Sequence, residues 1–132
     1  MTITYAWRGD FEDAAVDALH GEAFGHAPTG TEWGARVRRH GLGWVCARRD
    51  GRLVGFVNVV WDGGAHAFLL DTMVASDQRG RGVGTELVAV AAEEARSAGC
   101  HWLHVDFEEG LRPFYLEACG FRATDAGLIA LR

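Results

Sequence analysis

No other part of the sequence restricts the fold as much as the stretch from Phe68 to Gly99. An apolar run at residues 68–74 leads through a short polar link into a glycine-rich turn at residues 78–84. A long Ala- and Val-rich pattern with helical spacing follows the turn at once. The sequence therefore predicts a strand, a tight turn and a helix that ends near Gly99.

The glycine-rich turn predicts an anion site. Gly80, Gly82 and Gly84 stand at every second position, so the backbone can approach a ligand closely. A helix that starts at Gly84 directs its unpaired N–H groups and its positive dipole end into the same space. Arg79 and Arg81 add two permanent positive charges that suit a polyanion. We therefore expect the ligand to carry a pyrophosphate group.

The glycine spacing separates this turn from two familiar phosphate loops. It is neither the G-x-G-x-x-G dinucleotide fingerprint nor a P-loop with its Lys-Ser/Thr ending. Read from Arg79 through Gly82 to Gly84, it resembles the R-x-x-G-x-G motif that binds acetyl-CoA in the GNAT-type N-acetyltransferases. The resemblance assigns cofactor binding to the residues of this turn: Arg79, Gly80, Arg81, Gly82, Val83, Gly84 and Thr85.

A second segment resembles the same family. Phe114-Tyr115, followed by Gly120-Phe121, is similar to the Phe-Tyr and Gly-Phe pairs that the family carries after its cofactor turn. In the family the tyrosine lies beside the cofactor sulfur, which implies that Tyr115 protonates the leaving thiolate. The structural alternative is that Tyr115 only packs on the sheet with Phe114.

Hydrophobic periodicity and turn residues predict the order of elements along the chain. Strands are expected at residues 2–7, 44–48, 52–61, 66–74, 102–107, 121–124 and 128–131. Helices are expected at residues 11–19 after an Asp10 cap, 31–41 after a Thr31 cap, 84–98 and 111–119, with a loop at residues 21–30. The order resembles the GNAT acyl-CoA N-acyltransferase fold of the mixed α/β (α+β) class, in one domain over residues 1–132. That resemblance implies a mostly antiparallel mixed sheet of about six or seven strands with about four helices and one splayed parallel strand pair.

Charge and cysteine content limit the partners and the compartment. The net charge is −5 although the chain has 13 basic residues, so general nucleic-acid binding is not expected and a cationic acceptor is favoured. Neither a signal peptide nor a membrane span is expected. Cys46, Cys100 and Cys119 are odd in number and lie in apolar surroundings, which indicates a reduced cytoplasmic protein without a disulfide framework.

Acetyl transfer to an amine sets further requirements. The resemblance implies that backbone N–H groups near Met73 and Val74 hold the thioester carbonyl. The amine must also lose a proton, and Asp71 is the first candidate base because it is the one charged residue in an apolar strand. The alternative is a structural carboxylate bonded to Arg or His.

Other polar and aromatic residues are weaker site candidates. His66, His104 and Asp106 lie on predicted strands and could face the cleft, but a single strand histidine is usually structural. His101 and His104 are an odd number of residues apart and so point to opposite faces, and no metal site is expected. Three tryptophans are candidates for lining an acceptor pocket, with core packing as the expected role of at least two of them. These are Trp33, Trp44 and Trp61.

Two functions of different classes fit these patterns. The first is an acetyl-CoA-dependent N-acetyltransferase that acts on a primary amine of a small molecule or peptide, with a homodimer as one possible state. The second is a non-catalytic acyl-CoA sensor or association module. Two departures from the family pattern favour this second function: Phe68 and Glu108 stand where the family often has Glu and Asn. The acceptor itself has no signature in the sequence.

Overall fold

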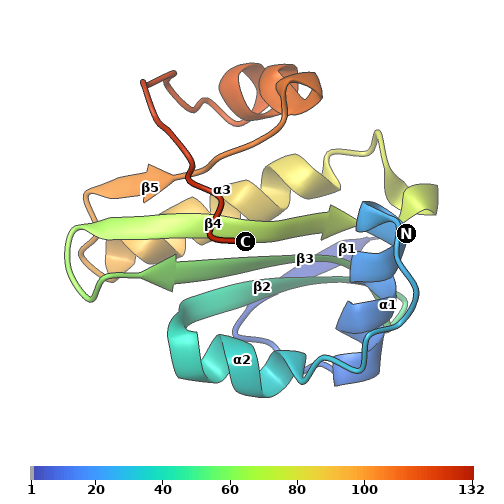
Figure 1. Ribbon diagram of the computed structural model, residues 1–132. Coiled ribbons are helices and arrows are strands. Elements are labelled where there is room, and N and C mark those ends of the chain that lie inside the picture. The colour runs from blue at the N-terminus through green and yellow to red at the C-terminus, as the bar shows by residue number, and fades with distance from the viewer. Residues whose placement is uncertain (1) are drawn as a thin grey trace.

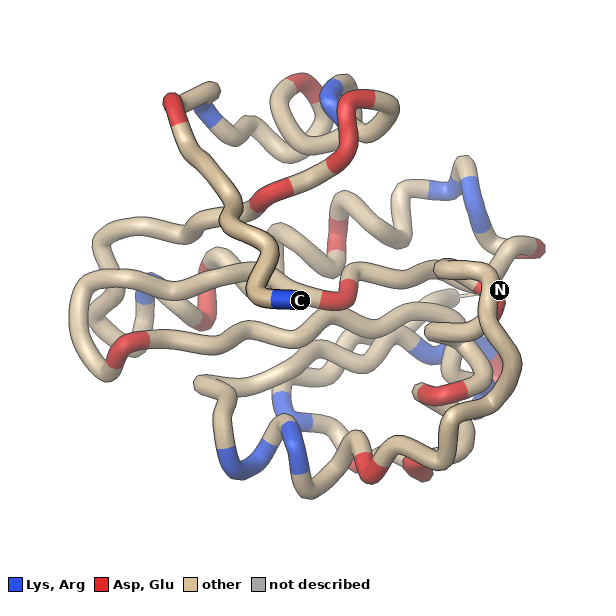
Figure 2. The backbone as a smooth tube through the Cα atoms, viewed as in Figure 1, with Lys and Arg blue, Asp and Glu red and all other residues tan. Residues whose placement is uncertain are grey.

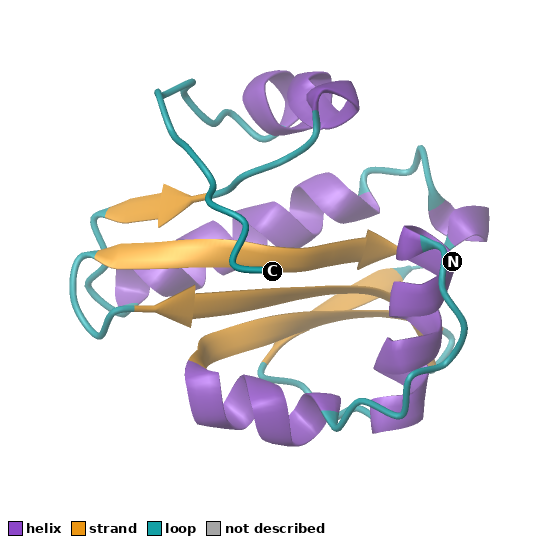
Figure 3. Ribbon diagram, in the orientation of Figure 1, coloured by secondary structure: helices purple, strands orange, loops and turns teal. Residues whose placement is uncertain are grey.

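The computed structural model describes residues 2–132, and its centre is a five-stranded sheet in the order β1-β2-β3-β4-β5 (Figures 1 and 3). The strands are β1 (Ile3–Trp7), β2 (Gly41–Arg49), β3 (Arg52–Trp61), β4 (His66–Val74) and β5 (Trp102–His104). The first four strands pair as an antiparallel meander, and β5 lies parallel to β4. A helical crossover between β4 and β5 makes this parallel pair possible.

Three α-helices cover the two faces of the sheet. They are α1 (Asp13–Phe24), α2 (Trp33–His40) and α3 (Val83–Ser97). Figure 1 shows α1 and α2 on one face and α3 on the other. Neighbouring residues of β3 mark the two layers: the Phe56 ring lies 5.3 Å from that of Phe11 and 6.4 Å from that of Trp33. On the opposite face, a Cβ at Gly55 would lie 3.0 Å from Leu87 of α3.

The β4 strand is irregular at Asp71 and Thr72. Its register with β3 shifts there, so that these two residues lie opposite Val57 alone in a β-bulge. Asp71 has a positive φ of 56°, a conformation that few non-glycine residues adopt. The bulge therefore re-aims the side chains of β4 before the strand reaches the glycine-rich turn.

The parallel pair separates soon after it forms. Its pairing runs from His66 with Trp102 to Phe68 with His104 and no further. Beyond that point, no strand among residues 2–132 pairs with the edge of β4 from residue 69 onward. The expected splayed pair is thus present, although β5 ends at His104 and not at residue 107.

The expected C-terminal hairpin was wrong. Residues 121–132 contain no strand, which leaves five strands in the described chain where six or seven were expected. Leu128 and Ile129 are 84% and 86% exposed. Residues 121–132 pair with no strand of the described sheet, and an isolated two-stranded hairpin has too little buried surface to be stable in water.

Several helix boundaries also differ from the predictions. Helix α1 begins after Glu12, not Asp10, and continues through Gly21 to Phe24, where a loop was expected. Gly25, with φ of 76°, ends it. Helix α2 begins after Glu32 and not after Thr31.

The last helix is split into two short segments and not a single α-helix. They are the 3-10 turn η2 (Glu109–Leu111) and the π-helix η3 (Pro113–Ala118). Helix α3 starts one residue before the predicted Gly84. Within residues 2–132, no helix combines the length and apolar content that crossing a bilayer requires.

Candidate functional site

The glycine-rich turn presents open backbone at the start of α3. A short 3-10 helix, η1 (Ser76–Gln78), leads from β4 into Gly80 and Gly82, which have positive φ angles of 76° and 80°. A Cβ built on either glycine would meet no atom within 4 Å. The backbone here is exposed to an approaching ligand and not packed against the protein.

The first turn of α3 leaves its amides available. No side chain caps this end, and the first helical hydrogen bond runs from the Glu86 N–H to the Gly82 carbonyl at 3.0 Å. The N–H groups of Val83, Gly84 and Thr85 therefore have no partner within the helix. Three such amides at the positive end of a helix fit a phosphate group.

Gly84 has a different role from the other two glycines. A Cβ there would lie 3.0 and 3.1 Å from ring atoms of Phe114 and 3.7 Å from Val74. The absence of a side chain lets α3 approach η3 closely. Gly84 thus fixes the distance between the glycine-rich turn and the segment that carries Tyr115.

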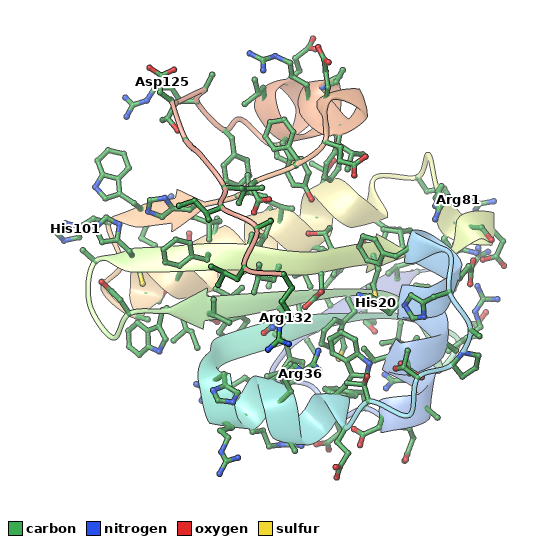
Figure 4. The ribbon with its side chains drawn as sticks, viewed as in Figure 1. His20, Arg36, Arg81, His101, Asp125 and Arg132 are labelled. Carbon is green, nitrogen blue, oxygen red and sulfur yellow. The ribbon has the colours of Figure 1, made fainter. Side chains whose placement is uncertain are left out.

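Arginine side chains surround the turn with positive charge. Arg79 and Arg81 are exposed, and neither forms an ion pair with any residue of the described chain. Figure 2 shows basic residues in blue at the turn that leads into α3, and Figure 4 shows the Arg81 side chain. Arg52, in contrast, is paired with Asp77 at 2.5 Å. The charges of Arg79 and Arg81 thus remain available to a polyanion.

The open edge of β4 offers a backbone donor near the turn. The Ala75 N–H donates to the Val54 carbonyl at 2.8 Å, which makes these two residues a hydrogen-bonded pair of the ladder. Bonded and non-bonded pairs alternate along antiparallel strands, so Val74 directs its N–H away from β3, toward the side from which β5 has diverged. The same alternation directs the N–H of Met73 toward β3. Of the two predicted donors, only Val74 faces the open edge.

Tyr115 lies beside the β4 bulge. The residue is only 6% exposed, and its ring stacks on Phe107 with centroids 5.0 Å apart. Burial raises the pKa of the Tyr115 phenol, while a hydrogen bond with Thr72 acts in the opposite direction. The phenol is therefore protonated near neutral pH and can donate a proton. Tyr115 thus packs on aromatic rings, Phe114 among them, and its role as a proton donor stays a prediction.

Asp71 has a histidine partner, as the alternative of a carboxylate bonded to Arg or His expects, although the sequence did not identify which histidine. His20 Nε2, on α1, lies 3.5 Å from Asp71 Oδ1, and both side chains are about a quarter exposed or less. His20 Nδ1 lies 2.6 Å from His26 Nε2. Figure 4 shows His20 on the side of α1 that faces the sheet. No local pattern could reveal this contact, because α1 and β4 are far apart in sequence and meet only through tertiary packing.

A buried carboxylate holds the region around His20 in place. Asp17 accepts hydrogen bonds from the Thr29 hydroxyl at 2.6 Å and the Thr29 N–H at 2.8 Å, and from Trp33 Nε1 at 3.3 Å. These bonds, those from Thr29 foremost, lower the pKa of Asp17 to about 2. Asp17 thereby ties α1 to the following loop and to the start of α2.

The weaker candidates lie elsewhere or in the core. His66 Nδ1 lies 2.8 Å from His104 Nε2 where β4 meets β5, and the His104 ring stacks on Phe68. Trp33 and Trp44 are buried, as expected of at least two tryptophans. Residues 2–132 contain no group of three or more His, Cys, Asp or Glu side chains that could hold a metal ion. All three cysteines are free thiols.

Comparison with known proteins agrees with this geometry. The family model described as "Acetyltransferase (GNAT) family" matches residues 5–121. The fold is similar to a crystal structure of an acetyltransferase from Trypanosoma brucei, with a TM-score of 0.80 and 25% identity over 98% of this chain and 99% of that one.

Two curated relatives are similar in sequence. The mycothiol acetyltransferase of Nocardia farcinica is 30% identical over 111 residues, which are 79% of this chain and 37% of the relative. The glucosamine 6-phosphate N-acetyltransferase of Trypanosoma brucei brucei is 34% identical over 86 residues, which are 61% of this chain and 58% of the relative. The matches thus span less than two thirds of each curated relative.

Proposed function

The chain belongs to the acetyltransferase (GNAT) family, and on that premise we propose that it transfers an acetyl group from acetyl-CoA to a primary amine. The observation that carries the proposal is the placement of an open, arginine-flanked glycine turn next to a splayed strand edge with a buried phenol. Transfer to an amine requires an anion site, an aligned acyl group and groups that move protons. This arrangement provides a candidate for each.

The residues of the turn fit coenzyme A. The amides of residues 83–85 and the guanidinium groups of Arg79 and Arg81 would hold its diphosphate, and Gly80 and Gly82 leave room for it. Acetyl-CoA, when bound, supplies an acyl group activated as a thioester. The Val74 N–H would orient the acyl carbonyl and stabilise its developing charge.

Two side chains at the bulge would move protons. Tyr115 holds a proton near neutral pH and would give it to the departing sulfur. Asp71, with its positive φ, would accept a proton from the amine. Thr72, the neighbour of Asp71 in the bulge, lowers the pKa of Tyr115 through a side-chain hydrogen bond, which links the phenol to the strand that carries the proposed base.

The acceptor class is a small-molecule or peptide amine. The name of one relative specifies an amino sugar, glucosamine 6-phosphate, which makes that compound the first to try. The chain is also acidic, with a net charge of −5, which suits an acceptor that arrives as a cation. The three free thiols are what a reducing cytoplasm would maintain, so we infer a cytoplasmic location.

Calorimetric titration with acetyl-CoA tests the cofactor site. We expect saturable binding by the full chain and none by Gly82→Glu, because the new side chain would be strained and would place a negative charge in the anion site. Gly63→Glu is the matched control: Gly63 has the same φ of 80° and open surroundings, but it lies in the β3–β4 turn. Absence of binding by the unmodified chain at millimolar acetyl-CoA would refute the proposal.

Release of free thiol from acetyl-CoA tests for catalysis. The acceptors are glucosamine 6-phosphate, spermidine and a tripeptide with a free N-terminus, which represent amino sugars, polyamines and peptides. Turnover with at least one of them supports an N-acetyltransferase. Tight acetyl-CoA binding with no turnover of any amine in a broadened panel would favour the sensor function instead.

A further inference from the structure

Three titratable side chains from three parts of the chain form one continuous row beside the β4 bulge. His20 Nε2 faces Asp71 Oδ1 at 3.5 Å, and His20 Nδ1 faces His26 Nε2 at 2.6 Å. His26 Nδ1 lies 2.7 Å from the Ala27 carbonyl oxygen. We propose that this row relays the proton of the acceptor amine from Asp71 to solvent. The relay rests on the proposed acetyl transfer, in which Asp71 is the base, and His20 and His26 act through Asp71.

The far end of the row determines where the protons lie. A carbonyl oxygen only accepts, so Nδ1 of His26 donates to Ala27, and Nε2 of the neutral His26 ring accepts. The contact between the rings then requires Nδ1 of His20 to donate. In the neutral His20 ring, Nε2 is left unprotonated, and this atom faces Asp71. A hydrogen bond between Asp71 and His20 needs one further proton, which would lie between Asp71 Oδ1 and His20 Nε2.

In the part of the chain that the structure describes, the surroundings of His20 contain no competing partner for that proton. Its ring lies among aromatic neighbours, with centroids 4.5 Å from Phe24 and 5.0 Å from Trp33. The nearby carboxylates of α1 are engaged elsewhere: Asp17 with Thr29 and Trp33, and Glu22 with the Ser76 N–H at 2.5 Å.

Charged groups on the elements packed near α1 do not contact the ring nitrogens of His20 in the described chain. From α2, the Arg36 guanidinium lies over the Trp33 ring, 4.9 Å from its centroid. From the turn, Arg79 lies near Glu22. Only Asp71 and His26 touch the ring nitrogens of His20 in the described chain.

The proton balance of the relay is simple. An ammonium nitrogen has no free electron pair and cannot attack a thioester, so one N–H bond must break first. Its proton goes to the Asp71 carboxylate and from there to Nε2 of His20, whose ring becomes an imidazolium. His20 then gives its Nδ1 proton to Nε2 of His26, and the exposed His26 ring gives its own Nδ1 proton to water. Both rings are then in the Nε2–H form and return to the Nδ1–H form by proton exchange with water before the next turnover. Asp71 is left ionised, as it began.

The tautomers can be measured without any substrate. Long-range ¹H–¹⁵N spectra of the ¹⁵N-labelled full chain distinguish the two ring nitrogens of each histidine. We expect both His20 and His26 in the Nδ1–H form when neutral, with exposed His101 as the internal reference. An Nε2–H form at His26 would break the row and overturn the proposal, whatever the outcome of the activity assays.

A pH series tests the role in turnover. His20→Gln fills the space but cannot pass a proton, and we expect kcat to fall on the order of 10²-fold at pH 7 with the KM for acetyl-CoA unchanged. The deficit should shrink as pH rises, because more of the amine is then neutral without help. The rates are measured with whichever of glucosamine 6-phosphate, spermidine or the tripeptide is turned over fastest.

Control variants separate the relay from a structural effect. His101→Gln changes an exposed histidine distant from the row and should leave both kcat and its pH dependence unchanged. A deficit in His20→Gln that stays constant across pH would show a structural role and overturn the relay. Failure of the proposed function is a separate result, since it would show as absent acetyl-CoA binding by the unmodified chain.

Discussion

Tyr115 is a phenol enclosed by aromatic rings. Phe107 stacks on it, and Phe114 and Phe121 contact it edge-on with centroids 4.8 and 5.9 Å away. We expect Tyr115→Phe to keep this packing and to lower kcat on the order of 10²-fold, because only the proton donor is removed. Steady-state kinetics and acetyl-CoA titration measure the two effects separately. Tyr5→Phe, on β1, is the control, and unchanged kcat in Tyr115→Phe would exclude the donor role.

Asp17 links stability to pH. Its pKa is lowered to about 2 from an ordinary 3.8, so its ionised form favours the folded state. That stability is fully present above pH 3.8 and is lost as pH falls toward 2. We therefore expect Asp17→Asn to lower the urea midpoint at pH 7, and the difference from the unmodified chain to narrow below pH 4. Asp125→Asn, at an exposed position, should show no such narrowing.

Local and distant residues of the site differ in how far sequence could reveal them. The conformation of the glycine turn could be predicted because it depends on consecutive residues with special backbone angles. His20 could not be, because its role depends on a bulge in β4 and on an α1 longer than its glycines suggest. The orientation of Met73 likewise depends on the register with β3, which no single-strand pattern determines.

At the scale of elements, α3 packs directly on the backbone of β3. A Cβ at Gly55 would lie 3.0 Å from Leu87, 3.1 Å from Val83 and 3.2 Å from Ala47. We expect Gly55→Ala to lower the free energy of unfolding by about 1–3 kcal/mol, because helix and sheet would have to separate slightly. Urea denaturation measures it. Gly127→Ala, where a Cβ meets no atom, is the control, and equal stability of the two variants would contradict this packing.

The central elements were predicted better than the terminal ones. Strands β3 and β4 have the expected bounds because Asp50-Gly51 and Asp62-Gly63-Gly64 are strong local turn signals. The C-terminal strands and the single last helix were wrong. The pattern of the C-terminal strands is apolar enough for regular structure, but among the described residues Leu128, Ile129 and Leu131 are left exposed, so tertiary context overrides propensity.

At the scale of the whole molecule, the C-terminal segment is the part with the most exposed apolar surface. Leu128, Ile129 and Leu131 are 84–91% exposed. Deleting residues 128–132 should therefore change the unfolding free energy by less than about 0.5 kcal/mol. Denaturation and sedimentation velocity of both chains measure this. A larger loss, together with conversion of a dimer to a monomer, would show that a second copy covers these side chains in solution.

The short pairing between β4 and β5 has a consequence for how the molecule opens. Only three residue pairs join β4 and β5. Residues 105–132, which include Tyr115, are held to the rest of the molecule by those pairs and by packing contacts such as Phe114 on Gly84. Amide hydrogens in this last part of the chain should exchange with deuterium earlier than those of β2 and β3. A molecule of coenzyme bound across the gap would bridge the fast- and slow-exchanging parts and delay that exchange.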